Sequence, residues 1–273
     1  MRYLGSAFKY IFKNFIFVFV FALIPSYFLA MTADLKNLAS IAESVAAGNA
    51  DVEFYQIFSF LSPINEEGWP FALVFLAVAA VCMPLLLGFI ERHMRIGNRS
   101  FKGIAGQLNS NFVSTLVVLL VFAVIYELWS LIAAGLIYAV VLILDGPVCL
   151  ALAVAVLLGM AALISYLASL LLLWLPSMQI TGYSFMDSLS YSNQLYVPNR
   201  GKLFLAVFLP FLAGVLLQFA IVAVSPTEIF RIPAYIFLEL IYLVLFLYYN
   251  SLMYVAYFDA AGEERVDLKK KFG

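Results

Sequence analysis

The chain has 273 residues, of which 65% are hydrophobic and 11% are charged, with a formal net charge of -1 and a mean hydropathy of +1.03. Soluble domains carry about 25% charged residues, so this composition excludes an ordinary soluble enzyme, and we expect no nucleic-acid partner. The apolar stretches lack the alternation of barrel strands, and several reach the roughly 20 residues that a helix needs to cross a bilayer. We therefore predict an all-α polytopic membrane protein.

The first apolar stretch covers residues 14–31 and follows a basic N-terminal segment, a pattern also typical of a secretory signal peptide. Phe28 and Met31, however, stand where a signal-peptide cleavage site requires small residues. We therefore expect an uncleaved first span. The expected spans of this single domain, residues 1–273, lie at about 14–31, 69–90, 112–144, 148–176, 203–224 and 232–257.

The long loop 32–68 between the first two spans contains apolar residues at helical spacing. These residues are Leu35, Leu38, Ile41, Ala42 and Val45. We predict an amphipathic cap on the outer face, lying in the interface or against a protruding helical hairpin. An interfacial helix without a special role explains the same pattern.

The third and fourth spans are nearly continuous in the sequence, and Asp145-Gly146-Pro147 is the expected turn between them. Basic residues set the orientation, because cytoplasmic loops are enriched in Lys and Arg. Of the 15 Lys and Arg residues, only Lys36 and Arg231 fall on the expected outer side, and 15 minus 2 leaves 13 on the other. We predict a protein of the cell membrane with both termini in the cytoplasm.

A similar lead-in segment precedes the first, third and fifth spans, at residues 6–11, 100–104 and 184–189. Each segment is followed by an asparagine shortly before the membrane, namely Asn14, Asn111 and Asn199. This pattern predicts three hairpin repeats, each with a cytoplasmic amphipathic lead-in helix. Chance similarity among interfacial segments rich in Phe and Ser is the alternative.

Four short segments carry a resemblance to a known family. They are 184–192 (SFMDSLSYS), 199–204 (NRGKLF), 257–259 (YFD) and 263–268 (EERVDL). Together they resemble a broad group of prokaryotic six-span proteins that includes the YciC-type proteins and the membrane domain of some glycerophosphodiester phosphodiesterases. The resemblance implies the six-span fold. It implies no phosphodiesterase activity, because the chain differs in its long acidic loop 32–68 and carries no attached soluble domain.

Two acidic residues, Glu127 and Glu239, fall inside expected spans, where a charge costs about 2.5 to 3.5 kcal/mol. The helical rise places Glu127 roughly 8 Å and Glu239 about 10 Å below the outer boundary, so the two share a layer. As one hypothesis, they line an outward-open polar pocket for a proton, a cation or a cationic headgroup. The alternative is a pair of neutral or interface-reaching carboxyls that stabilise packing.

A basic rim follows the second span. If the helix continues past Gly97, then four cations at three- and four-residue steps share one face and are candidates for binding anionic lipid. They are Arg92, Arg95, Arg99 and Lys102. Ordinary topology signals explain the cluster equally well. His93, the single histidine of the chain, lies among these cations, and we do not expect it to bind a metal.

The sequence contains no phosphate-binding glycine loop, no His-Glu-x-x-His motif and no cysteine cluster. We therefore predict no catalytic residues, no metal site and no cofactor. The outer acids follow no ligand spacing and are expected to form a solvated face. We predict a non-enzymatic integral membrane protein that binds lipid, a partner membrane protein or a second copy of itself. The alternative is a small transporter or permease component with Glu127 and Glu239 along its pathway.

Overall fold

The computed structural model of the protein describes residues 2–46, 52–144, 146–224 and 231–268, and the regular structure in these ranges is helical. These ranges hold six helical stretches that are long and apolar enough to cross a membrane, which confirms the predicted all-α architecture with six candidate spans. The stretches are Arg2–Ala30, Trp69–Ile96, Asn111–Ile143, Gly146–Thr181, Phe185–Ile221 and Ile232–Ala260.

Six long helices and several short ones build these stretches. The long helices are α1 (Arg2–Ala30), α4 (Trp69–Ile96), α5 (Ile104–Ile143), α6 (Gly146–Leu171), α9 (Arg200–Val224) and α10 (Arg231–Ala260). The short elements are α2 (Leu35–Ala46), α3 (Phe54–Leu61), α7 (Trp174–Thr181), α8 (Phe185–Tyr196), and the 3-10 turns η1 (Val197–Asn199) and η3 (Val266–Leu268). Several helices extend beyond the expected spans, because helical hydrogen bonding satisfies the backbone on both sides of the hydrocarbon boundary.

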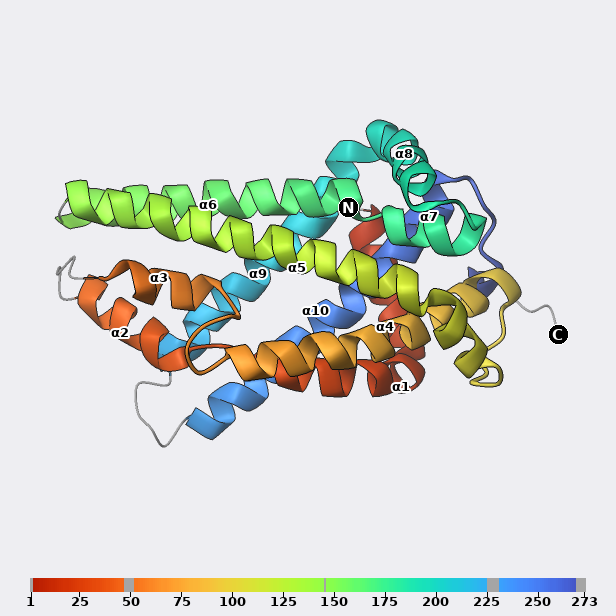
Figure 1. The fold of residues 1–273 in the computed structure, drawn as a ribbon, viewed down its shortest axis with the longest axis horizontal. Coiled ribbons are helices and arrows are strands. Elements are labelled where there is room, and N and C mark those ends of the chain that lie inside the picture. Colours follow the sequence, from red (N-terminus) through yellow and green to blue (C-terminus); the bar gives the residue numbers. More distant parts are fainter. Residues whose placement is uncertain (1, 47–51, 145, 225–230, 269–273) are drawn as a thin grey trace.

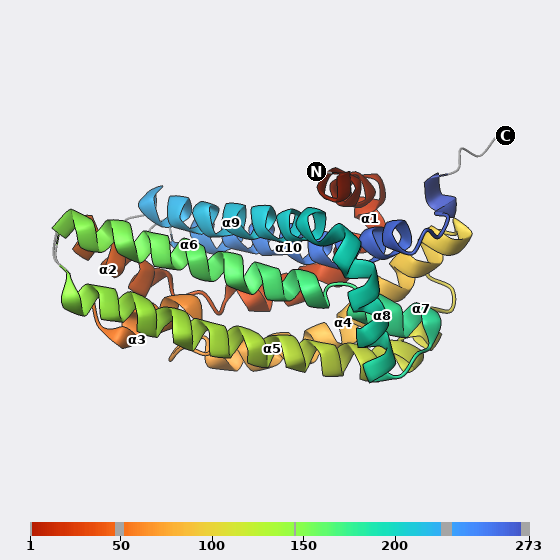
Figure 2. The ribbon, with the colours of Figure 1, turned by 90° about the horizontal axis from the view of Figure 1, so that it is seen from above.

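α4, α5 and α6 run roughly along the longest axis of the molecule, whereas α9 and α10 slope across it (Figures 1 and 2). α1 packs against α10 and α4, α4 packs against α5, and α6 packs against α5 and α9. α2 and α3 lie at one end of this bundle, which we call the cap end (Figure 1). α7, α8 and residues 261–268 lie at the other end, which we call the rim end.

Two hydrophobic cores hold the helices together. The larger core draws buried side chains from α1, α4, α5, α7, α8, α9 and α10, and includes the buried rings of Tyr248 and Tyr254. The smaller core lies at the cap end and joins α3 to α5 and α6 through Ile57, Trp129 and Ile164. The short helices of the outer loop are therefore part of a packed core, as expected for a cap that lies against a helical hairpin.

The three lead-in segments differ in how they join their spans. α8 is a separate helix, and the hydroxyl of Ser184 caps its first turn by accepting a hydrogen bond from the backbone N–H of Asp187 at 3.3 Å. The lead-in at 6–11 belongs to α1 and continues into its span without a break in the helix. Of the lead-in predicted at 100–104, only residue 104 is helical, as the first residue of α5. Gly146, with φ 67°, makes the turn that begins α6, whereas Asp145 lies outside the described residues.

Candidate functional site

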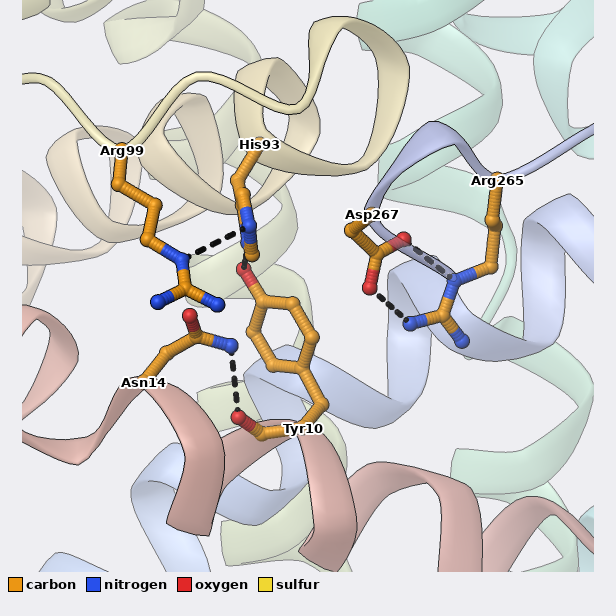
Figure 3. A network of polar contacts seen from close by, with 6 residues as sticks. All are labelled: Tyr10, Asn14, His93, Arg99, Arg265 and Asp267. Atoms are coloured by element: carbon orange, nitrogen blue, oxygen red, sulfur yellow. Dashed lines mark hydrogen bonds and ion pairs between the residues drawn. The ribbon is translucent and has the colours of Figure 1, made fainter. Parts of the chain in front are cut away.

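A chain of polar contacts joins three segments at the rim end (Figure 3). The Tyr10 hydroxyl of α1 lies 3.1 Å from Nδ1 of His93 in α4, and Arg99 Nε donates to His93 Nε2 at 3.2 Å. Because the Arg99 N–H needs an acceptor, Nε2 carries no proton. His93 is therefore neutral with its proton on Nδ1, from which it donates to the Tyr10 oxygen.

The end of α4 brings Arg99 back over His93. α4 stops at Gly97, whose φ of 74° is the left-handed conformation of a helix C-cap, and the chain then reverses. His93 is buried, with 3% of its surface exposed, whereas Arg99 is exposed. A buried imidazole thus fixes the orientation of a solvent-facing guanidinium, whose Nε is occupied and whose two terminal nitrogens point away from that bond.

Asn14 and the C-terminal segment complete the surroundings of this contact. Asn14 is 1% exposed, and its Nδ2 donates to the Tyr10 carbonyl at 2.9 Å. Its Oδ1 is buried and has no hydrogen-bond partner among the described residues. Arg265 lies over the Tyr10 ring at 5.9 Å and pairs with Asp267 at 2.8 Å, so this cation is neutralised within its own segment.

The four predicted rim cations have different roles. Arg95 pairs with Glu91 at 2.8 Å, and Arg92 donates through Nη1 to the carbonyl of Lys102, which ties the loop after α4 to its last turn. The idea that all four share one helix face is wrong, because α4 ends at Ile96 and the left-handed Gly97 turns the chain. Arg99 and Lys102 belong to the loop that follows.

Five cations of this region have no carboxylate partner within ion-pair distance among the residues that the structure describes. They are Lys9, Lys13, Arg92, Arg99 and Lys102. The first two come from α1 and the others from the end of α4 and the loop after it. The rim end therefore presents an excess of positive charge around Arg99.

The two predicted intramembrane acids have separate surroundings. Glu127 Oε2 accepts a hydrogen bond from the Ser62 hydroxyl at 2.6 Å and lies 3.5 Å from the Ser130 hydroxyl. Glu239 is partly exposed, and no hydrogen bond or ion pair links it to another described residue. Glu127 is thus bound to loop 32–68. No described interaction joins the two carboxyls, so the shared pocket stays a prediction.

Sequence reasoning placed Tyr10 and Asn14 in or after a lead-in segment and His93 among the rim cations, but it did not predict that these residues meet. Tyr10 and His93 lie 83 positions apart, and their contact depends on how α1 packs against α4. The one sequence signal for this site was Asn14, which follows the lead-in 6–11. An amide at the start of an apolar stretch requires a hydrogen-bond partner.

Comparisons of the chain with the models of known protein families, with curated proteins and with solved structures find no match. The resemblance to the YciC-type group therefore stays a prediction, and the function is argued from the geometry of the site.

Proposed function

We propose that this chain is a non-enzymatic integral membrane protein that binds the anionic headgroup of a lipid at its rim end. The supporting observation is the Arg99 guanidinium, which buried His93 holds through Nε while no carboxylate of the described residues lies within ion-pair distance of it. Two terminal N–H groups of an arginine in a fixed orientation match the two oxygens of a phosphate diester. The headgroup binds there, and His93 and Tyr10 act as positioning residues.

The charge around Arg99 supports the same assignment. Each basic residue near an anionic membrane surface contributes about 1 kcal/mol to the free energy of binding to that surface. Lys13 and Lys102 are exposed and carry no ion pair with a described carboxylate, so their charge is available to a phosphate. The excess of Lys and Arg at this end also supports its placement in the cytoplasm.

The internal repeat is part of this proposal, because two of the lead-ins end in the same contact. Asn14 Nδ2 donates to the carbonyl four residues earlier at 2.9 Å, and Asn199 Nδ2 does the same at 3.3 Å. Such a bond satisfies the side-chain amide within its own helical turn, as Asn250 does inside α10 at 2.7 Å. We infer three hairpins, each entered from a lead-in at the membrane surface, of which the first carries Lys9 and Lys13.

Lipid binding to the purified protein tests the proposal. The protein is exchanged into nanodiscs of phosphatidylcholine, phosphatidylglycerol is titrated in, and the bound lipid is counted by native mass spectrometry. Arg99→Gln and the double variant Arg92→Gln/Arg99→Gln should weaken retention of phosphatidylglycerol by about fivefold per lost cation. Arg200→Gln/Lys202→Gln is the matched control, because it removes two exposed cations at the start of α9.

The variant His93→Phe tests the orientation of the Arg99 guanidinium separately from the positive charge of the rim end. This variant keeps every cation, yet it removes the acceptor for Arg99 Nε, so retention should fall nearly as far as in Arg99→Gln. Equal losses in the double variants Arg92→Gln/Arg99→Gln and Arg200→Gln/Lys202→Gln would overturn the proposal and leave only a diffuse surface charge. A protein that co-purifies in a fixed ratio and is lost with Arg99→Gln, without lipid selectivity, would assign the rim to a protein partner.

A further inference from the structure

A cavity of about 300 Å³ opens at the cap end, far from the rim. It lies where the end of α1, the connection before α4, the first turn of α4 and the start of α10 meet. Its lining residues are Met31, Ala33, Asp34, Asn65, Glu67, Gly68, Phe71, Ile232 and Tyr235. Segments from both halves of the chain thus build one concave surface.

Hydrogen bonds hold the walls of this cavity in place. Asn65 is 3% exposed, and its Nδ2 donates to the Thr32 carbonyl at 2.7 Å while its Oδ1 accepts from the Gly68 N–H at 2.6 Å. A Cβ on Gly68 would lie 2.7 Å from Asn65 Oδ1, so this close approach requires glycine. The Tyr235 hydroxyl donates to the Ala33 carbonyl at 3.2 Å, which attaches α10 to the end of α1.

The lining combines negative charge with aromatic and aliphatic surface. Asp34 accepts from the Asn37 N–H at 3.0 Å and from the Ser59 hydroxyl at 2.9 Å, so its carboxylate is oriented and keeps acceptor capacity. Glu67 is exposed and lies 3.5 Å from Lys36, a surface pair of small energy. No described lining residue is basic. The sequence had suggested a solvated acidic face, whereas these two acids border a cavity with Phe71 and Tyr235.

We propose that this cavity binds an organic ammonium group, with the cation between the two carboxylates and the aromatic lining and its carbon substituents against Met31 and Ile232. Tyr and Phe rings attract such cations through their negative faces, and the carboxylates exclude anions. A hard metal ion is a poor match, since Ca²⁺ takes about six to eight oxygen ligands and no described group of three acids, His or Cys comes together.

Choline and its uncharged carbon isostere, 3,3-dimethylbutan-1-ol, test this assignment in protein held in nanodiscs of phosphatidylglycerol alone. Isothermal titration calorimetry should detect choline binding and no binding of the isostere. Asp34→Asn/Glu67→Gln should weaken choline binding by about tenfold or more, because the attraction between opposite charges is lost. Glu66→Gln is the matched control, since it removes an exposed neighbouring acid that does not line the cavity.

The lipid composition then distinguishes two sources of the ammonium group. If a zwitterionic lipid supplies it, replacing part of the phosphatidylglycerol by phosphatidylcholine should compete with free choline and raise its apparent Kd. If the ligand is a free amine, the Kd stays unchanged. If Asp34→Asn impairs folding, the single variant Glu67→Gln still tests whether a carboxylate of the cavity contributes to choline binding, because Glu67 is exposed. Equal binding of choline and the isostere, or equal losses in Glu66→Gln and Glu67→Gln, would overturn the proposal, and neither result bears on the rim end.

Discussion

A carboxyl inside an apolar helix is tolerated where the fold supplies hydroxyl groups to it. Glu127 receives the Ser62 hydroxyl at 2.6 Å, and the neighbouring Tyr126 hydroxyl donates to the Leu61 carbonyl at 3.1 Å. Both bonds end at the last turn of α3, so two adjacent residues of α5 hold one end of the cap. An unpaired polar group at this depth would cost several kcal/mol, about 2 or more, which explains why the loop residue opposite Glu127 is a serine.

A double-mutant cycle between Ser62 and Glu127 measures this attachment. We expect Ser62→Ala and Glu127→Ala to be coupled by about 0.6 kcal/mol, with an upper value of about 1.7 kcal/mol, the range of hydrogen bonds between membrane helices. The free energy of unfolding in mixed micelles is the measured quantity. The cycle of Ser62→Ala with Glu239→Ala is the control, and its coupling should be zero. Equal coupling in both cycles would contradict the assignment.

Residue types were predictable from the sequence, whereas their partners were not. Glu127 and Arg99 stand out because each is a charge in or beside an apolar stretch. The partner of Glu127 lies 65 positions away, and the partner of Arg99 is a histidine that only the reversal at Gly97 brings within reach. Helical periodicity states which face a residue occupies, and it carries no information about which helix covers that face.

At the scale of the elements, hydropathy predicted the spans well and their ends poorly. The six expected spans each lie within or along a long helix, yet α5 begins at Ile104 and has 40 residues, or about 60 Å at 1.5 Å per residue. A hydrocarbon core of about 30 Å leaves much of this helix outside the apolar layer. Its partner α6 is held to it by Trp129, whose indole N–H donates to the Met160 carbonyl at 2.7 Å.

Trp129→Phe should weaken the α5–α6 hairpin, because the carbonyl of Met160 then loses a buried donor. The expected loss is about 1 kcal/mol, the net contribution of a typical hydrogen bond, and a lowered Tm in detergent would report it. Trp69→Phe is the matched control, since Trp69 is 51% exposed and Trp129 only 4%. A Tm drop of the same size in both variants would show that ring size alone matters.

The whole molecule contains two cores. Helices α5, α6 and α9 contribute to both, whereas α1, α4, α7, α8 and α10 belong to the larger core and α3 to the smaller. The cap-end core depends on α3, which contacts α5 through Ile57 and Leu61 and reaches α9 through the Phe60 and Phe219 rings, 5.3 Å apart. The larger core does not use α3. Stability therefore differs along the bundle, and the smaller core is expected to open first.

Ile57→Ala should loosen the cap end while the rim end stays protected. Ile57 is 4% exposed, and removal of its side chain leaves a cavity against α5. Hydrogen exchange read by mass spectrometry should accelerate in peptides from residues 54–61, with unchanged protection in 83–94 and 247–258. Acceleration in all three regions would mean that the two cores unfold together.

The pairing of the first helix with the last sets the order in which the protein can be completed. Arg2 pairs with Asp259 at 2.8 Å, and the Tyr235 hydroxyl bonds to the Ala33 carbonyl across 202 positions. A ribosome adding about 5–20 residues per second needs roughly 10–40 s to make that stretch. During this time the surface of α1 that later packs against α10, its most extensive contact, remains uncovered in the bilayer. α1 is therefore covered only once α10 has been made, and a chain that stops before α10 leaves the buried face of α1 exposed to degradation.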